Sequence, residues 1–497
     1  MNARVKMALL ALVITLVLGG VIFRVTGWFS GSSIGSATFI SKPELPRTRT
    51  ISINLVGDIL PARAIELSMR SKGYDYPFGA MGSMLGDADL TFANLESPLI
   101  GDAESGRTTP GGTTVFRGDI NFAAALKRAG IDIVSLANNH MKDQGQRGIQ
   151  STLETLNAAG VAHVGAGLDL ANARALRIME IHSSSSPHER PIRVGFLAYN
   201  DEDVVPPSYH ATESQSGTHI MDVVELKEDI LAARGQVDLL IVSMHSGTEY
   251  VTAKPNDRQT TFAHAAIDAG ADMVVGHHPH VLQPSELYKG KYIYYSLGNF
   301  VFDQPWPDTK QSVLVHMQVD LELSTSTDAW EVRQYLPDIM PLQIVRFQPQ
   351  PTTSLEQARA VFQVLGLPYS VLNLGKQSIM VEKATSTAAR ERGLSGRFGL
   401  SAHTGMLFVF DQPGRHGFWM QDMRFPIDLY WFDANLRLTG SRLGVTPETY
   451  PDVLYPQGDN VRDDLYVLET AQGQLDPATL TLDLTGVLTE SHTYDKK

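Results

Sequence analysis

Side chains able to bind a divalent metal occur in six short clusters along this chain. Carboxylates suit hard ions, imidazoles suit borderline ions, and one carboxylate can bridge two ions about 3.5–4 Å apart. The clusters are Asp58; Asn94 and Glu96; Asn138, Asn139 and His140; His245 and Glu249; His277, His278 and His280; and Asn299. Any one of these residues alone is typical of a cap or a turn. The prediction of a metal centre therefore depends on all six clusters together.

Each cluster follows within a few residues of an apolar stretch that the residue pattern predicts to be a strand. The predicted strands cover residues 51–56, 90–93, 131–136, 194–198, 237–244, 273–275 and 292–296. Residues 121–129 and 147–159 have helical patterns, and residues 312–322 and 330–335 have the pattern of antiparallel strands. This order is typical of an α/β fold in which helices flank a sheet sandwich. Because strand ends converge on one crevice, the clusters are predicted to form one site.

The composition excludes several classes of chemistry. The chain has 497 residues, no cysteine and a formal net charge of −13. Without cysteine there is no disulfide, no thiolate nucleophile and no sulfur-ligated zinc. The negative charge opposes binding to polyanions, so we expect no nucleic-acid partner. The length predicts two or more domains.

The N-terminal segment predicts attachment to a membrane. Residues 7–23 are uncharged, and Arg4 and Lys6 precede them. The run is at the short end of what spans a bilayer, and the basic residues favour a cytoplasmic N-terminus. Residues 1–29 are thus interpreted as a cytoplasmic stub and a single transmembrane helix in the cell membrane, residues 30–50 as a linker, and the rest as extracytoplasmic. A cleaved signal peptide is the alternative, with Gly35-Ser36-Ala37 a little downstream.

Six motifs occur in order within residues 51–320. They are Gly57-Asp58; Asn94-Leu95-Glu96-Ser97-Pro98; Asn138-Asn139-His140 with Asp143 and Gly145; His245-Ser246-Gly247-Thr248-Glu249-Tyr250; Gly276-His277-His278-Pro279-His280; and Ser296-Leu297-Gly298-Asn299-Phe300. Together they resemble the CapA or PGA_cap (poly-γ-glutamate capsule synthesis) family, a branch of the calcineurin-like metallophosphoesterases. The resemblance implies a metallophosphatase-like four-layer αββα sandwich over residues 51–348, with one or two divalent ions (Mn, Fe, Zn or Mg).

The resemblance also implies a role for each residue of the site. The metal ligands it implies are Asp58 and His280 for one ion, Glu96 as the bridge, and Asn139, His245 and His278 for the second ion. His140 would act as the catalytic residue on the leaving group or on the phosphoryl charge. The residues that would orient ligands or substrate are Asn94, Glu249 and Asn299.

Two departures from the wider superfamily bear on activity. The superfamily opens with Asp-x-His, whereas this chain has Asp58-Ile59-Leu60, so one ligand of the first metal is missing. Glu96 also stands where an aspartate usually bridges the ions. The site is expected either to bind the second ion weakly or to have lost hydrolysis.

Capsule or cell-envelope polymer synthesis or export is the function that the resemblance implies, with metal-dependent hydrolysis left open. A metallophosphoesterase acting on another envelope substrate and a non-catalytic polymer-binding scaffold are the alternatives. The partners expected are an anionic polymer or a phosphoester substrate, membrane synthase subunits, and the membrane itself. Arg63, Arg117 and Arg147 lie near the motifs and either line a basic groove or are solvated surface residues.

A second, β-rich domain is predicted over residues 377–490, after a linker at 349–376 and before a polar tail at 491–497. The residues that indicate it are Ile379-Met380-Val381-Glu382-Lys383-Ala384, Glu391-Arg392-Gly393-Leu394, Gly405-Met406-Leu407-Phe408-Val409-Phe410, Phe418-Trp419-Met420, Pro426-Ile427-Asp428-Leu429 and Tyr466-Val467-Leu468-Glu469. They resemble domain-of-unknown-function family 192, although Gln421-Asp422-Met423 replaces the Lys-Asn-Thr usual in that family. The aromatic residues are interpreted as core, with Arg392, Arg397 and Asp428 as a polar pocket beside them.

Overall fold

The computed structural model describes residues 47–101, 115–183, 189–324, 326–397, 399–455, 464–485 and 487, all within one compact unit, Pro46–Lys497. The predicted transmembrane helix, most of the predicted linker at 30–50 and the predicted tail lie outside these residues. Within the described part of the chain, no helix combines the length and the hydropathy that a membrane span requires.

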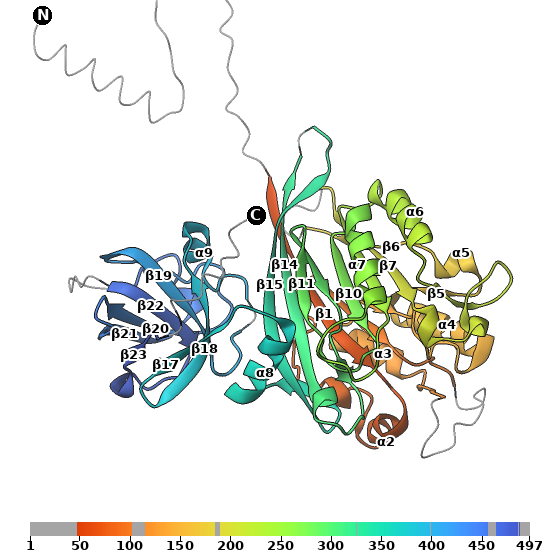
Figure 1. Cartoon of the computed structure of the whole chain (residues 1–497), viewed down its shortest axis with the longest axis horizontal. Coiled ribbons are helices and arrows are strands. Elements are labelled where there is room, and N and C mark those ends of the chain that lie inside the picture. Colours follow the sequence, from red (N-terminus) through yellow and green to blue (C-terminus); the bar gives the residue numbers. More distant parts are fainter. Residues whose placement is uncertain are drawn as a thin grey trace, which may run out of the picture. The chain divides into compact units, whose positions relative to one another are not determined.

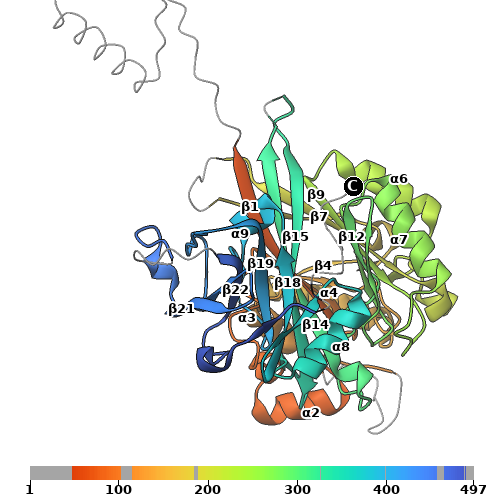
Figure 2. The ribbon, with the colours of Figure 1, turned by 60° about the vertical axis from the view of Figure 1, so that its left-hand side comes forward.

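The first sheet is built around β1 (Thr48–Ile59), which pairs in parallel with β2 and β13 and antiparallel with β14. Along the main path its strand order is β16-β15-β14-β1-β2-β3-β4 in the described residues. The bounds are β2 Leu90–Leu95, β3 Ile133–Ser135, β4 Ala162–Val164, β13 Asn299–Val301, β14 Gln311–Leu323, β15 Trp330–Val345 and β16 Gln348–Pro351. β14 and β15 form a long antiparallel hairpin between β1 and the short strand β16 (Figure 2).

The second sheet has the order β11-β12-β10-β9-β7-β6 among the described residues. Its bounds are β6 Arg177–Ile181, β7 Ile192–Asn200, β9 Leu239–His245, β10 Met273–His277, β11 Ser285–Tyr288 and β12 Lys291–Tyr294. β7, β9, β10 and β12 run parallel to one another. A small two-stranded pair, β5 (Ala166–Gly167) with β8 (Gly217–Thr218), lies apart from both large sheets.

The two sheets pack face to face, and helices cover both outer faces. Alternate residues of each strand point to opposite faces, so Ile53 and Ile241 enter the core between the sheets, whereas Val242 packs against helices. The helices are α2 Arg63–Lys72, α3 Phe122–Ala129 and α4 Gly145–Ala159 on the first sheet, and α6 Val223–Arg234 and α7 Asp257–Ala269 on the second; short α5 is Leu170–Ala173. Figure 1 shows α6 and α7 along the second sheet. These layers have the helix, sheet, sheet, helix order expected from the sequence.

Local sequence signals explain where the helices of the second sheet begin and end. The side chain of Asp222 accepts hydrogen bonds from the first turn of α6. Asn256 and Gln259 form a reciprocal capping box at α7, which ends at Gly270 in the left-handed conformation. Such caps satisfy backbone groups that the helix cannot. The capping box thus starts α7 at Asp257, a short loop after β9 ends at the site residue His245.

The predicted strands are strands in the structure, and most of their ends differ by a few residues, although the strand predicted at 330–335 continues to Val345 as β15. For example, the stretch predicted at 237–244 is β9, and the helix predicted at 147–159 begins two residues earlier as α4. The short strands β4, β6, β11 and β13 were not predicted. The segment 349–376, predicted as a linker, is structured: it holds the end of β16, α8 (Leu355–Leu365) and β17 (Ser370–Leu374). The apolar face of α8 packs into the core of the first sheet, which explains why this segment is ordered.

The C-terminal domain is β-rich, as predicted. Its sheet has the order β21-β20-β22-β19-β18-β17-β23 among the described residues. The bounds are β18 Gln377–Ala384, α9 Thr387–Arg392, β19 Thr404–Gly414, β20 Ile427–Asp433, β21 Leu438–Val445, β22 Asp464–Ala471 and β23 Leu482–Asp483. Phe408 and Phe418 are buried in its core, whereas Trp419 is 47% exposed.

The polar pocket predicted from Arg392, Arg397 and Asp428 does not form, because each of these side chains has different partners. The guanidinium of Arg397 donates two hydrogen bonds to Glu382, at 2.6 and 2.8 Å. The carboxylate of Asp428 accepts from the backbone N–H groups of Gly444 and Gly473, both at 2.7 Å. Asp428 therefore supports two turns.

Candidate metal centre

Strand register brings the predicted site residues together at the carboxyl ends of parallel strands in both sheets. Asp58 lies opposite Asn94 on β2 and opposite Asn299 on β13. In the second sheet, His277 at the end of β10 lies opposite His245 at the end of β9. All five of these side chains are buried. Residues far apart in sequence thus converge at the ends of parallel strands, as predicted.

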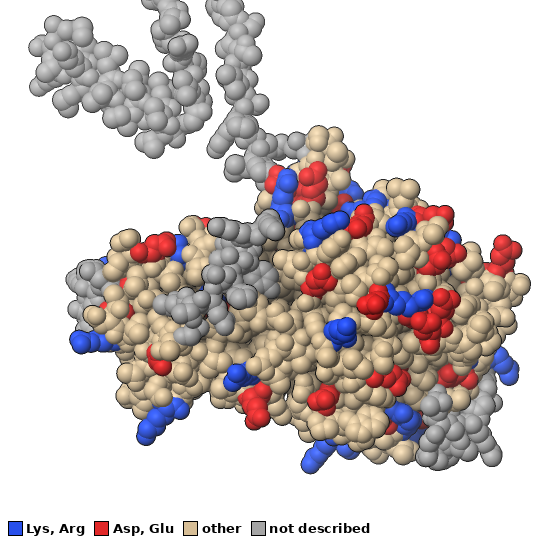
Figure 3. All heavy atoms as spheres, in the orientation of Figure 1, with Lys and Arg blue, Asp and Glu red and all other residues tan. Residues whose placement is uncertain are grey.

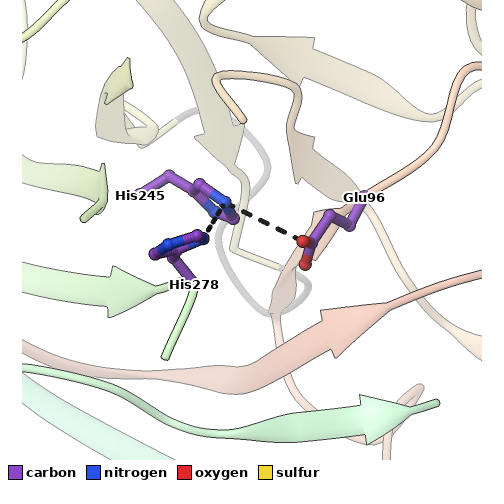
Figure 4. A group of neighbouring side chains, drawn as sticks. All are labelled: Glu96, His245 and His278. Atoms are coloured by element: carbon purple, nitrogen blue, oxygen red, sulfur yellow. Dashed lines mark hydrogen bonds and ion pairs between the residues drawn. The ribbon is translucent and has the colours of Figure 1, made fainter. Parts of the chain in front are cut away.

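Two groups of potential metal ligands share Glu96. One group consists of Glu96, His245 and His278, and the other of Asp58, Glu96 and His280, with the ligand atoms of each group within 4.8 Å of one another. Figure 4 shows His245, His278 and the carboxylate of Glu96 pointing toward a common centre. A carboxylate shared by two ligand groups is the arrangement that a two-metal site requires.

The carboxylate of Glu96 tests whether a cation fits here. Its Oε1 atom is buried and has no hydrogen-bond partner among the described residues. It lies 3.5 Å from Nε2 of His280 and 3.9 Å from Nε2 of His245. Burial and the nearby charge of Asp58 raise the pKa of Glu96 well above its usual value. An unpartnered buried carboxylate costs free energy unless a positive charge compensates it, so these residues fit a divalent cation.

The carboxylate of Asp58 differs from that of Glu96 because it has polar partners. Burial alone would raise the pKa of Asp58, but hydrogen bonds with His277 and His280 outweigh burial and hold it well below its usual value. The Nδ1 atom of His277 lies 3.1 Å from Oδ1 of Asp58, and Nδ2 of Asn94 donates to the same oxygen at 2.9 Å. Asp58 is therefore ionised and oriented.

Further hydrogen bonds orient the histidines. The Nδ1 atom of His280 donates to Oδ1 of Asn299 at 3.0 Å, which leaves Nε2 facing Glu96. The Nε2 atom of His245 lies 2.9 Å from Oδ1 of Asn139. Burial lowers the pKa of His245, and it lowers the pKa of His278 to about 3. Both imidazoles are therefore neutral, which is the form that binds metals.

His140 forms a dyad with Asp143 at the edge of this centre. Its Nδ1 atom lies 2.9 Å from Oδ2 of Asp143, a carboxylate that also accepts from the Tyr209 hydroxyl at 3.0 Å. The Nδ1–H group therefore donates to Asp143. The Nε2 atom faces the site, 4.0 Å from Oε1 of Glu96. Asp143 fixes the ring so that one nitrogen can exchange a proton with a bound substrate.

Close backbone approach and strain shape the loops that hold the ligands. A Cβ atom at Gly57 would lie 1.9 Å from the carbonyl oxygen of Gly298, and a Cβ atom at Gly276 would lie 2.0 Å from that of Tyr295. His278 and His280 have φ angles of 98° and 59°, which side chains with a Cβ rarely adopt. Such strain persists only where the surrounding structure enforces it and is concentrated at functional sites.

The structure adds detail at three residues of the centre. Glu249, predicted to orient ligands or substrate, is exposed, and its side chain hydrogen-bonds to Tyr250. Leu60, at the position of the missing histidine, is fully buried in the helix-facing core. His277 is part of a sequence motif, but no role was predicted for this residue. In the structure its ring, together with Asn94, orients Asp58. Its place at the end of a strand, within a run of histidines, was the available signal.

An aromatic and basic rim borders the centre. The guanidinium of Arg63 lies 4.9 Å from the ring centre of Phe116 and 5.6 Å from that of Phe302. Phe116 stacks on His140, and Phe302 packs against His280. Arg63 also pairs with Asp303 and has a φ angle of 56°. Arg63 therefore contacts one ring that stacks on His140 and another that packs against His280.

The other rim residues differ in character. Tyr250 and Trp306 are 43% and 53% exposed and meet edge to face at 5.0 Å. Of the other arginines considered from sequence, Arg117 pairs with Glu66 at 2.7 Å and Arg147 is exposed on α4. Arg63 contacts two rings that touch the site histidines, which places it at the rim.

Two segments of this chain match known protein families. Residues 52–304 match the family described as "Bacterial capsule synthesis protein PGA_cap", and residues 370–483 match DUF192, described as "Uncharacterized ACR". A capsule biosynthesis protein CapA of Bacillus anthracis is 33% identical over 319 residues, covering 63% of this chain and 72% of that protein. A PGA biosynthesis protein CapA of Bacillus subtilis is 33% identical over 286 residues, covering 55% and 70%.

Among solved structures, the calcineurin-like phosphoesterase YfkN of Bacillus subtilis matches with a TM-score of 0.37 and 14% identity. The match covers 64% of this chain and 96% of that chain. The family resemblance expected from the sequence motifs is confirmed by the two family matches and by the identity to the CapA proteins.

Proposed function

This chain belongs to the PGA_cap family of bacterial capsule synthesis proteins, and from that membership we propose that it serves the synthesis of an anionic envelope polymer of the poly-γ-glutamate type. We further propose that it acts as a metal-dependent hydrolase, on the polymer or on a phosphoester that accompanies its synthesis. The proposal assigns the chemistry to the centre around Glu96 and the recognition of the substrate to the rim around Arg63.

The observation that carries the proposal is the buried, unpartnered oxygen of Glu96 between two sets of ligands. A protein that only holds a polymer needs no such group, because an uncompensated buried carboxylate destabilises the fold. The proposed ligands are Asp58, Glu96 and His280 for one ion, and Glu96, His245, His278 and Asn139 for a second. When bound, a divalent ion supplies Lewis-acid polarisation of a carbonyl or phosphoryl oxygen and stabilises developing negative charge.

The chain's own residues perform the remaining tasks. His140 holds or moves a proton at Nε2, because Asp143 engages Nδ1. Asn299, Asn94 and His277 hold the ligand side chains in one orientation through the hydrogen bonds described above. Partners of this kind raise ligand basicity and are commonly as necessary as the ligands themselves.

The rim supports an anionic substrate that also has planar or apolar parts. Lys and Arg side chains are interspersed with Asp and Glu on the face shown in Figure 3, so that face has no field of one sign to attract a polyanion. Recognition is then local: Arg63 offers a cation beside the centre, and Tyr250 and Trp306 offer exposed rings. An amide-linked polymer with a free pendant carboxylate on each unit matches both features.

We also propose that the chain is tethered to the cell membrane by residues 7–23, with the rest extracytoplasmic and next to membrane synthase subunits. The support is the uncharged segment and its preceding basic residues. Labelling of a single cysteine introduced at exposed Glu213, in intact cells, tests this arrangement. Labelling by a membrane-impermeant reagent is expected, and protection until the cells are lysed would contradict it.

The function is tested on the full-length chain by metal analysis and by two hydrolysis assays in Mn²⁺, one with poly-γ-glutamate and one with a chromogenic phosphodiester. One or two equivalents of metal are expected, with turnover that disappears in His278→Ala. Turnover of the phosphodiester alone would favour a phosphoesterase acting on another envelope substrate. Metal-free protein without turnover would contradict the hydrolase assignment and favour a polymer-binding scaffold.

A further inference from the structure

The C-terminal domain contains a cavity of about 300 Å³, separate from the metal centre. α9 and the turn after it form one side, and aromatic side chains of β19 and of the loop at 415–419 form the other. Its lining includes Phe408, Phe418, Trp419, Glu391, Arg415 and Glu469. This volume is at the lower end of what small-ligand sites occupy, and it is close to the size of one amino acid with its hydration.

A buried carboxyl group lies against this cavity. Glu469 on β22 is 5% exposed, and its Oε2 atom has no hydrogen-bond partner in the part of the chain that the structure describes. Gly393, with φ of 53°, lets the turn after α9 pass close by: a Cβ there would lie 3.2 Å from the Phe408 ring and 3.7 Å from Oε2 of Glu469. The carboxyl is thus enclosed on the protein side and faces the cavity.

The two arginines of α9 that line the cavity have partners other than this carboxyl. Arg390 donates to the carbonyl oxygens of Thr385 and Val409 and lies 5.3 Å over the Phe410 ring. Arg392 donates to Oε1 of Gln318 at 2.7 Å. Burial raises the pKa of Glu469 to about 8, although the charge of Arg397 opposes this shift. A buried acceptor with aromatic walls and no cation of its own is a site that a ligand cation would complete.

We propose that this cavity binds the ammonium group of an amino-acid-sized ligand, with Glu469 as the acceptor and Phe408, Phe418 and Trp419 as the walls. The carboxylate of the ligand lies at the rim, where Arg415 is exposed and lines the cavity. Opposite charges at the floor and the rim select a zwitterion over a simple amine or a simple acid. Nothing in this proposal depends on the hydrolase assignment or on the capsule polymer.

The test uses three matched probes with the full-length chain, in a chelator so that the metal centre does not contribute. L-norvaline has both charges, n-butylamine lacks only the carboxylate, and pentanoate lacks only the ammonium group. Isothermal titration is expected to give saturable binding of L-norvaline, binding of n-butylamine that is several-fold weaker, and binding of pentanoate that is at least about tenfold weaker.

Two carboxyl variants locate the ammonium group. Glu469→Gln keeps the shape of the side chain and is expected to weaken L-norvaline binding at least about tenfold. Glu448→Gln, the matched change at an exposed carboxylate of the same domain that is not part of the cavity lining, is expected to leave affinity within about threefold. Trp419→Ala changes a half-exposed side chain, so the fold should survive, and a several-fold loss is expected.

Unchanged affinity in Glu469→Gln, or an equal loss of affinity in Glu448→Gln, would overturn the assignment of the floor. Equal affinity for pentanoate and L-norvaline would overturn the ammonium assignment, and equal affinity for n-butylamine and L-norvaline would overturn the rim contact. No binding of any probe at millimolar concentration, with the fold intact by circular dichroism, would overturn the proposal as a whole.

Discussion

Glu96 and Glu469 lie in different domains, and each leaves a buried oxygen without a hydrogen-bond partner among the described residues. Around Glu96 are four histidine side chains and a second carboxylate. Around Glu469 are aromatic rings and the backbone of a turn, and no described group of three metal-ligating side chains includes it. The same side chain in the same unsatisfied state therefore indicates a metal in one domain and an organic cation in the other. The neighbours decide the chemistry.

The largest expected effect is at Glu96. Because this carboxylate belongs to both ligand groups, Glu96→Gln should remove most bound metal and lower turnover at least about a hundredfold. Metal content by elemental analysis and turnover in Mn²⁺ measure the two effects. Glu213→Gln, at an exposed carboxylate far from the ligands in sequence, is the matched control and should change neither. Full metal content in Glu96→Gln would break the comparison with Glu469.

Removing a partner of a ligand should have a smaller effect than removing the ligand. Asn299→Ala removes the amide partner of Nδ1 of His280 and leaves only the more distant Asp58 carboxylate at 3.4 Å, so metal affinity should fall about 10- to 100-fold. Competition against a chelating dye measures the dissociation constant. Asn373→Ala, at an exposed asparagine of β17, serves as the control. If Asn299→Ala bound metal as tightly as the parent, His280 would need no orientation.

Arg63 should act on substrate binding more than on metal binding. Arg63→Gln is expected to raise KM about tenfold for an anionic substrate and to leave metal content unchanged, because a charge-assisted contact is lost while the ligands remain. Steady-state kinetics over a range of salt concentrations measure this effect. Arg147→Gln, at an exposed arginine of α4, should leave KM unchanged. A fall in kcat at constant KM would assign Arg63 to the chemical step instead.

The smallest expected effect is on the pH dependence of the free energy of unfolding, and it concerns Glu469. The folded pKa is about 8 and the usual value is 4.5, so between these values the unfolded chain loses a proton that the folded chain keeps. The contribution of this group is therefore fully present below pH 4.5 and is lost as the pH rises toward 8. Glu469→Gln should show a smaller loss of unfolding free energy between pH 5 and pH 8, by about 1 kcal/mol or more.

Urea unfolding followed by tryptophan fluorescence at pH 5 and at pH 8 measures that difference. Glu391→Gln should keep the pH dependence of the parent, because its carboxylate is exposed. Identical pH dependence in Glu469→Gln and the parent would show that Glu469 titrates normally and that its surroundings are more polar than its burial indicates.

Much of the first domain follows from local patterns in the sequence. Short apolar runs predicted β1, β2, β3, β7, β9, β10, β12, β14 and the first part of β15, whereas the short strands β4, β5, β6, β8, β11 and β13 were not predicted. The position of polar residues after the predicted strands indicated which side chains converge. The candidate ligands could be identified from the sequence because they follow predicted strands, and in an open α/β sheet the carboxyl ends of the strands border the binding crevice. The order of strands and helices predicted a sheet sandwich flanked by helices, and the family resemblance implied its four-layer form.

Other features depend on contacts that sequence spacing does not encode. His277 and Asp58 are 219 residues apart, and only the pairing of the two sheets places one beside the other. Arg63, Arg117 and Arg147 were equivalent in sequence, and the rings that neighbour Arg63 distinguish it. In the C-terminal domain, the pocket predicted around Arg397 and Asp428 does not form, because these side chains bind Glu382 and backbone amides. The cavity of this domain is lined by Glu469 instead.

By itself, then, the sequence determined the family, the α/β character of the first domain, the β-rich character of the second, and the residue types that can bind a metal. These depend on short-range periodicity and on motifs, which operate within a few residues. The tertiary structure alone decided which carboxyl groups were left without partners. Whether a buried oxygen is satisfied depends on every segment packed around it, and that is why Glu96 and Glu469 became distinguishable only in the folded chain.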